Sequence, residues 1–353
     1  MRHRNRTRPS LTIGVDLGDK YAFTCTLDRD GEVVSRERLR MTIPDFREYF
    51  SGLRRCRVVI EAGSQSGWVS RELKRSGHQV IVANPRKVQL IYRSHNKSDK
   101  VDAERLARIG RLDPRLLYPV QHRGEDAQID LALLRSRDAL VKVRTLLINS
   151  VRSQVKVFGD RLPTCDSRYF HKKVTGKIPA RLQVALEPLV SQIADLTEDI
   201  TGYDRKIEEL SATKYPETAR LRQVSGVGSL VALAYILTLE DHRRFSRSRS
   251  VGPFLGLAPK RSDSGSHEPQ LRISKAGDRH LRQLLVNAAH CALRSNARES
   301  DLKAHGEAIA KRGGKNAKKR AVVAVARKLA VLLHRLWISG EEYEPLRQRE
   351  RVA

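Results

Sequence analysis

Four carboxylic acids stand in the first third of the chain at positions where they could bind a metal. Asp16 interrupts the apolar run TIGVDLG, and Glu61 ends the apolar run RVVIEA. A carboxylate is a poor strand residue and is costly to bury unless it is paired or bound to a metal. Asp99 and Asp102 are three apart in KSDKVDAERLARI, so on a helix their Cβ atoms lie about 5 to 6 Å apart on one face. We expect all four acids to converge on one site.

Clustered carboxylates repel each other and stay ionised only where cations compensate their charge. Oxygen ligands of this kind suit Mg²⁺ or Mn²⁺. Two such ions about 3.5 to 4 Å apart can activate the attacking oxygen of a phosphodiester and stabilise the leaving oxygen. Taken singly, Asp16 also fits a turn cap, Glu61 an ion pair, and the two later acids the acidic first turn of a helix. Only the combination predicts a divalent-metal site.

A second candidate for chemistry is a serine-rich loop near residue 264. Its serines, Ser262, Ser264 and Ser266, stand between basic residues on both sides, with Arg261 before them and Arg272 after them. A serine in a Gly-containing loop flanked by cations can attack a phosphodiester and hold DNA as a phosphoserine ester. Most Ser/Gly loops are only loops, however, and the spacing does not choose among the three serines.

Alternating strands and helices would position the acids. We expect helices near Pro44 to Leu53 and at Val69 to Arg75, and strands at the segments LTIGVDLG, YAFTCTLD, GEVVSRERL, RVVIEA and HQVIVANP. This order predicts an α/β domain with a mixed sheet over residues 10–122, and it matches the ribonuclease H-like fold. Adjacent strands of such a sheet can bring Asp16 and Glu61 side by side.

The middle of the chain, residues 123–212, has a helical period. Two stretches, Glu125 to Val157 and Ile178 to Leu210, carry apolar residues at steps of three and four and are separated by a Gly- and Pro-containing loop. The pattern predicts an antiparallel, coiled-coil-like arm, and an ordinary helical bundle fits it equally well. In either case we expect a spacer or an oligomerisation surface without chemistry.

The remaining sequence predicts a mainly helical domain over residues 213–340 and a tail over residues 341–353. VSGVGSLVALAYIL places a Gly-x-Gly turn before an apolar helix, as in a helix-hairpin-helix element, whose exposed amides can hold a phosphate. Two amphipathic helices follow the serine loop, at SKAGDRHLRQLLVNAAHCALR and KKRAVVAVARKLAVLLHRLW. The fold class is therefore α/β followed by α.

The composition indicates a polyanionic partner. Lys and Arg number 68 against 40 Asp and Glu, a formal charge of +28 that is spread along the chain. A basic, merely soluble surface would show the same excess, so charge alone does not separate binding from chemistry. The sequence has no apolar run of transmembrane length, no secretory signal and no C-x-x-C pair. We therefore expect no membrane partner, and a cytoplasmic protein that is nucleoid-associated when it acts.

Several segments together resemble a known family. They are IGVDLGDK, VVIEAGSQSGW, VANPRKV, NKSDKVDAERLA, VSGVGSLVALAYI, FLGLAPKRSDSG, RISKAGDRHLRQLL and AVVAVARKLA. In this order, over nearly the whole chain, they resemble the insertion-sequence transposases of the DEDD class, which are relatives of the pilin-gene invertase and are viewed as bridge-RNA-guided serine recombinases.

The resemblance implies a role for each candidate residue. It implies a RuvC-like domain in which Asp16, Glu61, Asp99 and Asp102 bind Mg²⁺ or Mn²⁺, then a coiled coil, then a transposase domain. The family's nucleophile is the serine of an acidic-Ser-Gly triplet, which is Asp263, Ser264 and Gly265 here. The resemblance therefore implies Ser264 as the nucleophile of a phosphoserine–DNA intermediate.

The same resemblance implies partners and leaves two rivals. It implies donor and target DNA, a structured guide RNA, and a homo-oligomer, either a dimer or a tetramer. One rival is a RuvC-like junction-resolving nuclease that uses the acids with water as nucleophile. The other is a non-catalytic nucleic-acid-binding protein in which the acids are structural.

Overall fold

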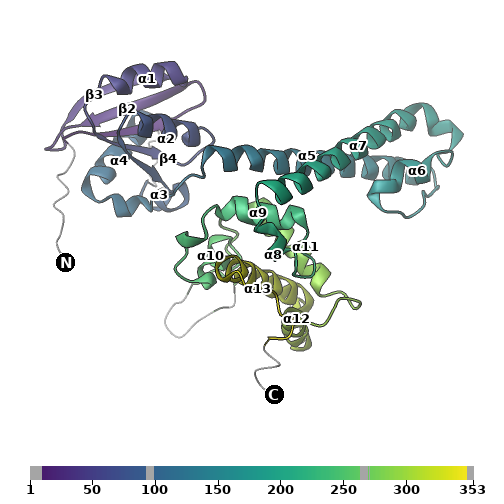
Figure 1. Cartoon of the computed structure of the whole chain (residues 1–353). Helices are drawn as coiled ribbons and strands as arrows, with labels where there is room; N and C mark the ends of the chain where they lie inside the picture. Colours follow the sequence, from purple (N-terminus) through teal and green to yellow (C-terminus); the bar gives the residue numbers. More distant parts are fainter. Residues whose placement is uncertain (1–9, 93–98, 263–268, 270, 348–353) are drawn as a thin grey trace. The chain divides into compact units, whose positions relative to one another are not determined.

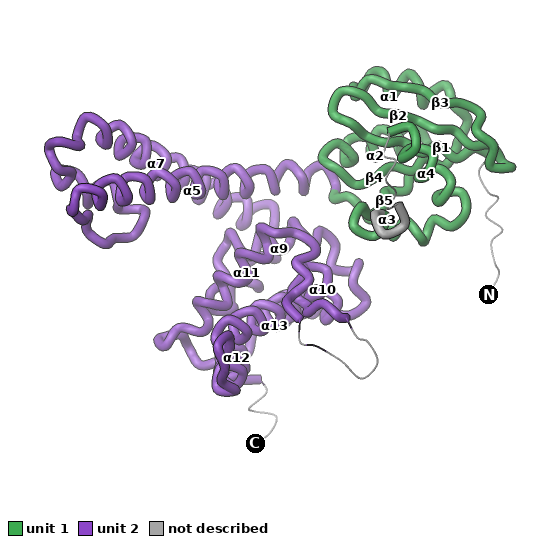
Figure 2. The backbone as a smooth tube through the Cα atoms, turned by 180° about the vertical axis from the view of Figure 1, so that it is seen from behind, with its two compact units in different colours: residues 1–123 green, residues 124–353 purple. Residues whose placement is uncertain are grey.

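The protein consists of two compact units, residues 1–123 and 124–353 (Figure 2). The computed structural model describes residues 10–92, 99–262, 269 and 271–347. None of the helices in these ranges is both long enough and apolar enough to cross a membrane.

The first unit is built on a mixed five-stranded sheet. Its strands are β1 (Thr12–Leu17), β2 (Tyr21–Leu27), β3 (Val33–Arg40), β4 (Arg57–Glu61) and β5 (Gln79–Ala83), in the spatial order β3-β2-β1-β4-β5. The strands β1, β2 and β3 pair antiparallel, whereas β4 is parallel to both of its neighbours. The predicted strands and the mixed sheet are confirmed.

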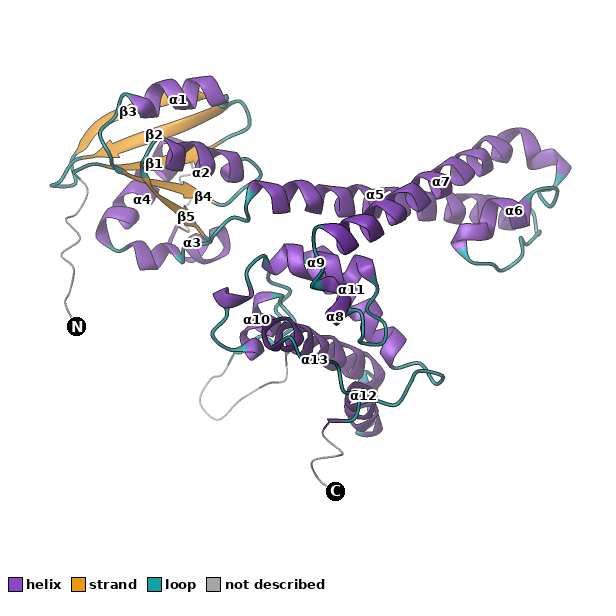
Figure 3. Ribbon diagram, viewed as in Figure 1, coloured by secondary structure: helices purple, strands orange, loops and turns teal. Residues whose placement is uncertain are grey.

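Helices cover both faces of this sheet (Figure 3). On one face, α1 (Ile43–Ser51) and α2 (Ser66–Arg75) bury Phe46 and Leu73 against Ile13, Val15 and other strand residues. On the other face lie α3 (Pro85–Tyr92), α4 (Asp99–Leu112) and a 3₁₀ turn (Pro114–Leu117). In this second layer Gly14 of β1 faces Ala103 and Ala107 of α4, so α4 comes close to the strands.

A pair of long helices begins the second unit (Figure 1). The first, α5 (Glu125–Val157), has the bounds that the sequence predicts, and it packs along α7 (Gln183–Thr213). The predicted start of the second helix at Ile178 is wrong, because a residue before a proline is disfavoured in the helical region and Pro179 follows. Short helical segments lie between the two long helices: Ser167–Tyr169, α6 (Phe170–Val174) and Ala180–Leu182.

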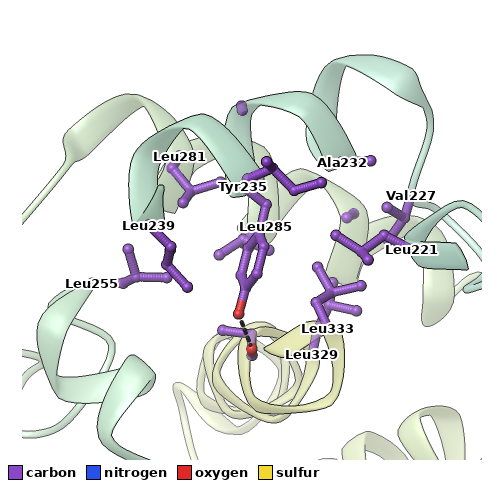
Figure 4. Close-up of a cluster of buried hydrophobic side chains, with 14 of the residues drawn as sticks. Leu221, Val227, Ala232, Tyr235, Leu239, Leu255, Leu281, Leu285, Leu329 and Leu333 are labelled. Atoms are coloured by element: carbon purple, nitrogen blue, oxygen red, sulfur yellow. Dashed lines mark hydrogen bonds between the residues drawn. The ribbon is translucent and has the colours of Figure 1, made fainter. Parts of the chain in front are cut away.

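The rest of the second unit packs around one buried helix, α9 (Ser229–Leu239), which the sequence predicted as an apolar helix after the Gly-x-Gly turn. Around it lie α8 (Thr218–Leu221), α10 (Val251–Phe254), α11 (Arg279–Ala292), α12 (Asp301–Lys311) and α13 (Ala317–Ser339), with 3₁₀ turns at His242–Arg244 and Ser248–Ser250. The buried hydroxyl of Tyr235 donates to the carbonyl oxygen of Ala330 at 2.6 Å (Figure 4). Burial raises the pKa of this phenol, which stays a neutral donor. One hydrogen bond thus links α9 to α13 inside the core.

This core also holds the base of the α5–α7 pair. Ala127, Leu131 and Leu134 of α5 and Ile207 of α7 belong to the same apolar cluster as α9. Part of the segment predicted as a tail is held as well, since the amide of Asp301 donates to the carbonyl of Pro345 at 2.7 Å. A boundary between a helical arm and a C-terminal domain near residue 212 stays a prediction.

Candidate active site

The strand register places Asp16 beside Glu61. In the parallel pair of β1 and β4, Val15 lies opposite Ile60, so the next position on each strand is one of the two acids. Side chains alternate between the faces of a sheet, so both acids lie on the face of Gly14. Both stand at the carboxyl ends of parallel strands, where α/β sheets commonly bind ligands. The predicted side-by-side placement agrees with this register.

The helix that carries the other two acids lies on the same face. A Cβ atom at Gly14 would overlap the carbonyl oxygen of Ala103 and lie 2.5 Å from the amide nitrogen of Ala107. Only glycine allows the backbones of β1 and α4 to approach this closely. Asp99 and Asp102 form the first turn of α4, directly before this contact. The structure therefore places Asp16, Glu61 and the helix that carries the other two acids on one face of one sheet.

Charged side chains also fasten α4 to the sheet. The guanidinium of Arg36, on β3, lies 2.7 Å from Glu104, and Arg108 lies 2.7 Å from the same carboxylate. Hydrogen bonds from Arg36 and then Arg108 lower the pKa of Glu104, so this carboxylate is ionised at neutral pH. Arg57 of β4 donates to the carbonyl of Gly110 at 2.7 Å. These contacts hold α4 against the sheet through residues other than the four candidate acids.

Gln65 joins the loops that follow the two acid-bearing strands. Its Nε2 donates to the carbonyl oxygens of Gly18, at 3.1 Å, and Asp19, at 2.9 Å. These contacts hold the loop after β4 against the turn after β1. Gln65 was not among the predicted site residues. Its place four residues after Glu61 in AGSQSGW was the only signal.

The four acids share a face but not a coordination sphere. Within the ranges given above, no three His, Cys, Asp or Glu side chains lie close enough together to hold a metal ion. Asp102 and Glu61 are half-buried, Asp99 is exposed, and Arg105 lies 3.5 Å from the carboxylate of Asp102. The chemistry of the donors, carboxylate oxygens alone, fits Mg²⁺ or Mn²⁺. Binding would require the acidic side chains to move toward one another, which a cation favours because it offsets their repulsion.

The predicted nucleophile, Ser264, lies outside the described residues, and so does Ser266. Ser262 is described and exposed. The chain on both sides of the loop forms a stem in the second unit. Its strands meet at an antiparallel bridge between Pro259 and Ile273, and a hydrogen bond of 3.0 Å joins the amide of Lys260 to the carbonyl of Arg272. This pairing brings two cations to the mouth of the loop.

The base of this stem is closely packed. A Cβ atom at Gly256 would overlap the backbone of Ala276, and both Gly256 (φ +70°) and Gly277 (φ +76°) adopt the left-handed conformation that favours glycine. From α11, Nη1 of Arg282 donates to the carbonyls of Leu255 and Ala276, at 3.0 Å each. One guanidinium therefore holds both arms of the stem. Only the tertiary structure reveals this role of Arg282.

A carboxylate, that of Glu208, lies beside the helix start for which the Gly-x-Gly pattern predicted a phosphate site. The hydroxyl of Ser229, the first residue of α9, donates to the carboxylate of Glu208. Glu208 also lies 2.7 Å from Arg222. The hydrogen bond from Ser229 and the nearby Arg222 lower the pKa of Glu208, so the carboxylate is charged at neutral pH. Glu208 therefore places a negative charge beside this helix start, whose backbone amides have no side-chain cap, and the phosphate site stays a prediction.

Replacing Gly14 by alanine tests the close approach of α4. We expect the new methyl group to push the helix from the sheet and to lower the free energy of unfolding of the first unit by about 1 to 3 kcal/mol, the usual cost of overpacking. Gly63→Ala is the matched control, because nothing lies within 4 Å of a Cβ atom built there. Thermal or urea unfolding measures both variants. Equal stability of the two would show that β1 and α4 do not touch in this way.

Two protein-family models match this chain, one in its N-terminal part and one in its C-terminal part. Residues 13–158, which include all four acids, match a family model of DEDD-type IS110 transposases. Residues 218–305, which include the serine loop and its stem, match the model of the transposase IS116/IS110/IS902 family.

Curated relatives align over most of the chain. The transposase for insertion sequence element IS1111A of Coxiella burnetii is 30% identical over 351 residues, which are 96% of this chain and 93% of the relative. A probable family 20 transposase of Pseudomonas aeruginosa is 28% identical over 82% of this chain and 86% of its own length. The transposase for insertion sequence element IS1328 of Yersinia enterocolitica is 29% identical over 80% and 84%.

The family model and the curated relatives show that this chain, a mixed-sheet unit with four candidate acids on its strands and on α4 followed by a helical unit, is a transposase of the DEDD class, an enzyme that cuts and rejoins DNA. The chain belongs to the IS116/IS110/IS902 family of insertion-sequence transposases. DNA is therefore its substrate, and proteins of the DEDD class normally use a divalent metal. The sequence-based prediction of a DEDD insertion-sequence transposase is confirmed.

Proposed function

We propose that this transposase breaks and rejoins DNA through a serine nucleophile, Ser264, that acts together with a divalent-metal site. The proposed metal ligands are Asp16, Glu61, Asp99 and Asp102. One observation supports the metal site: strand register puts Asp16 and Glu61 side by side, and the glycine contact at β1 puts α4, which carries the other two acids in its first turn, on the same face. A bound Mg²⁺ or Mn²⁺ would supply Lewis-acid stabilisation of phosphodiester oxygens.

The acids have a defined task in this proposal. They provide oxygen ligands and a concentrated negative charge, which draws divalent cations to the carboxyl ends of β1 and β4. Arg36 and Arg108 neutralise Glu104, so this fifth acid of the same face does not compete for the cation. The contacts of Gln65 keep the two strand ends together while the side chains adjust.

The serine step preserves the energy of the phosphodiester bond, because one phosphate ester bond replaces another. The Oγ–phosphorus bond forms while the bond from phosphorus to a deoxyribose oxygen breaks, and the proton lost by the serine balances the proton gained by the leaving oxygen. The reverse reaction with another DNA end rejoins the backbone without a cofactor. Lys260 and Arg272 at the mouth of the loop attract the phosphate. A family match over residues 218–305 supports the assignment.

The proposal extends to fold class, domain plan and partners. We assign the first unit to the RNase H-like, RuvC-like class, α5 and α7 to a coiled-coil arm over residues 123–212, and residues 213–340 to a transposase domain. We also assign a structured bridge RNA, a dimer or tetramer, and residence on the nucleoid during action. The net charge of +28 supports a nucleic-acid partner beyond the DNA ends.

The experiment uses the full chain purified from its own host together with any RNA that it retains. Incubated with DNA that spans the ends of its element and with Mg²⁺, the protein should form a covalent protein–DNA adduct that survives denaturation. Mass spectrometry should place the nucleotide on the tryptic peptide of residues 262–272. EDTA should prevent the adduct, and ribonuclease should abolish the choice of DNA site.

The outcomes separate the parts of the proposal. Cut DNA without an adduct would replace the serine mechanism by hydrolysis, as in a junction-resolving nuclease. Sequencing of the retained RNA tests the guide: RNA no more enriched than the cellular background would remove the bridge RNA and leave the serine step standing.

A further inference from the structure

The end of the arm formed by α5 and α7 is strongly basic. Residues 151–182, called here the basic arm tip, contain eight Lys and Arg against two Asp, a net charge of +6. The adjoining helix α7, residues 183–213, contains two Lys and Arg against seven Asp and Glu, a net charge of −5. Charge of opposite sign is therefore segregated along one arm, and the overall excess of cations does not explain this local pattern.

The basic arm tip has a core of its own. Val151, Val155, Phe170, Val174 and their neighbours pack in a cluster that is separate from the cluster around α9. The two clusters are about 21 Å apart along α5, at 1.5 Å per residue from Leu134 to Ile148. Figure 1 shows α6 at the end of the helix pair away from α9. The tip is thus a folded surface and not a frayed loop.

Most of its cations point into solvent and have no acidic partner among the described residues. Six exposed residues of the tip form no ion pair with any residue in the described part of the chain. They are Lys156, Arg161, Arg168, Lys172, Lys173 and Lys177. Both tip carboxylates are engaged: Asp160 with Arg181 at 2.9 Å, and Asp166 with the backbone amide of Arg168 at 2.8 Å. Burial, and then the charges of Lys172 and Arg144, lower the pKa of His171, as expected in a positive field.

Aromatic side chains lie among these cations. Tyr169 is 51% exposed and Phe158 is 50% exposed, with the guanidinium of Arg181 at 5.0 Å from the phenyl ring centre. Cations mixed with exposed aromatic rings suit a nucleic-acid backbone, which offers phosphates and stackable groups. Two of the seven acids of α7, Asp204 and Glu208, are already paired with Arg137 and Arg222, and contact of the tip with the other acids of a second copy is the competing outcome of the test.

We propose that the basic arm tip binds the phosphate backbone of a duplex nucleic acid, and so forms a nucleic-acid contact of its own, apart from the metal site and the serine loop. The proposal rests on the DNA substrate of the family and not on the chemistry of Ser264, since binding needs no cleavage. The ligand is the phosphodiester backbone, which duplex DNA and a folded RNA both provide.

The test compares two double variants of the full chain that lose the same charge. Lys172→Gln with Lys173→Gln changes the tip, and Arg205→Gln with Lys206→Gln changes exposed cations of α7. The probes are a 40-base-pair DNA duplex of arbitrary sequence and an RNA hairpin of equal length. For at least one probe, we expect the tip variant to bind about 10- to 100-fold more weakly at about 0.1 M salt. The salt slope, which is the decrease in log affinity per tenfold rise in salt concentration, should be lower by about two. The probe that responds identifies the source of the backbone.

The controls keep the result decisive. The α7 variant should change affinity less than about twofold, and Lys172→Arg with Lys173→Arg should restore the slope, because the contact depends on charge. If the tip double variant unfolds at a lower temperature than the unaltered protein, the single variant Lys177→Gln should lower the salt slope of binding by about one. Equal losses in the two double variants would reduce the effect to net charge and overturn the proposal. An unchanged affinity with an altered mass in analytical ultracentrifugation would also overturn it, in favour of contact with a second copy.

Discussion

Replacing Ser264 by alanine is expected to abolish strand exchange and covalent adducts while leaving DNA affinity nearly unchanged. The substitution removes the oxygen that forms the new bond to phosphorus, and the loss of a nucleophile costs at least about 10³-fold in rate. No other group of the loop has the family's acidic-Ser-Gly setting, which is Asp263, Ser264 and Gly265. The adduct is counted on a denaturing gel, and affinity is measured with labelled element ends.

The neighbouring serines are the matched controls. Ser262→Ala and Ser266→Ala remove the same hydroxyl two residues away on either side, and we expect both variants to keep forming adducts. Strand exchange that persists in Ser264→Ala would defeat the assignment. If one of the neighbours loses adducts instead, the nucleophile moves to that serine and the reaction class stays the same.

Replacing Asp16 or Asp102 by asparagine is expected to remove Mg²⁺-dependent cleavage. Each change takes one negative charge from the face of the sheet and replaces a carboxylate oxygen by a weaker ligand. Loss of groups that merely support a metal ligand already costs about 10- to 100-fold, so loss of a ligand itself should cost at least about 100-fold. Nucleic-acid affinity should change little, because the basic surface is intact. Cleavage rate as a function of Mg²⁺ concentration is the measurement.

Asp19→Asn is the control for this pair. Asp19 is exposed in the turn directly after β1, three residues from Asp16, so it shares the local charge without being one of the four candidate ligands. We expect this variant to cleave normally. If Asp16→Asn and Asp102→Asn also cleave at the normal rate, the four-acid site is wrong and the chemistry lies elsewhere in the chain.

Much of the first unit could be predicted because its signals are local. Strand alternation and turn residues gave all five strands, and the same pattern placed Asp16 and Glu61 on neighbouring strands. The sequence could not show why α4 lies so close to them. Gly14 looks like a weak strand residue until the backbone of Ala103 is seen against it. This contact joins residues far apart in the chain, and local periodicity carries no information about it.

The stem of the serine loop could not be predicted from the sequence, for a related reason. In the sequence, Arg282 looks like one more cation on an amphipathic helix. In the structure it donates hydrogen bonds to two backbone carbonyls of the stem. Likewise, the Gly-x-Gly turn suggested a free phosphate site, and only the fold brings Glu208 to it. Side chains that satisfy backbone groups of distant segments are indistinguishable in sequence from side chains that face a ligand.

The two separate apolar clusters along α5 and α7 mean that the stability of the second unit is not uniform. Protein segments with their own small core open as cooperative units at a lower free energy than the main core. The outer cluster can therefore loosen while the cluster around α9 stays intact. The outer part of the arm can change its conformation when it binds a partner. The core around α9, which supports the serine loop, does not have to unfold at the same time.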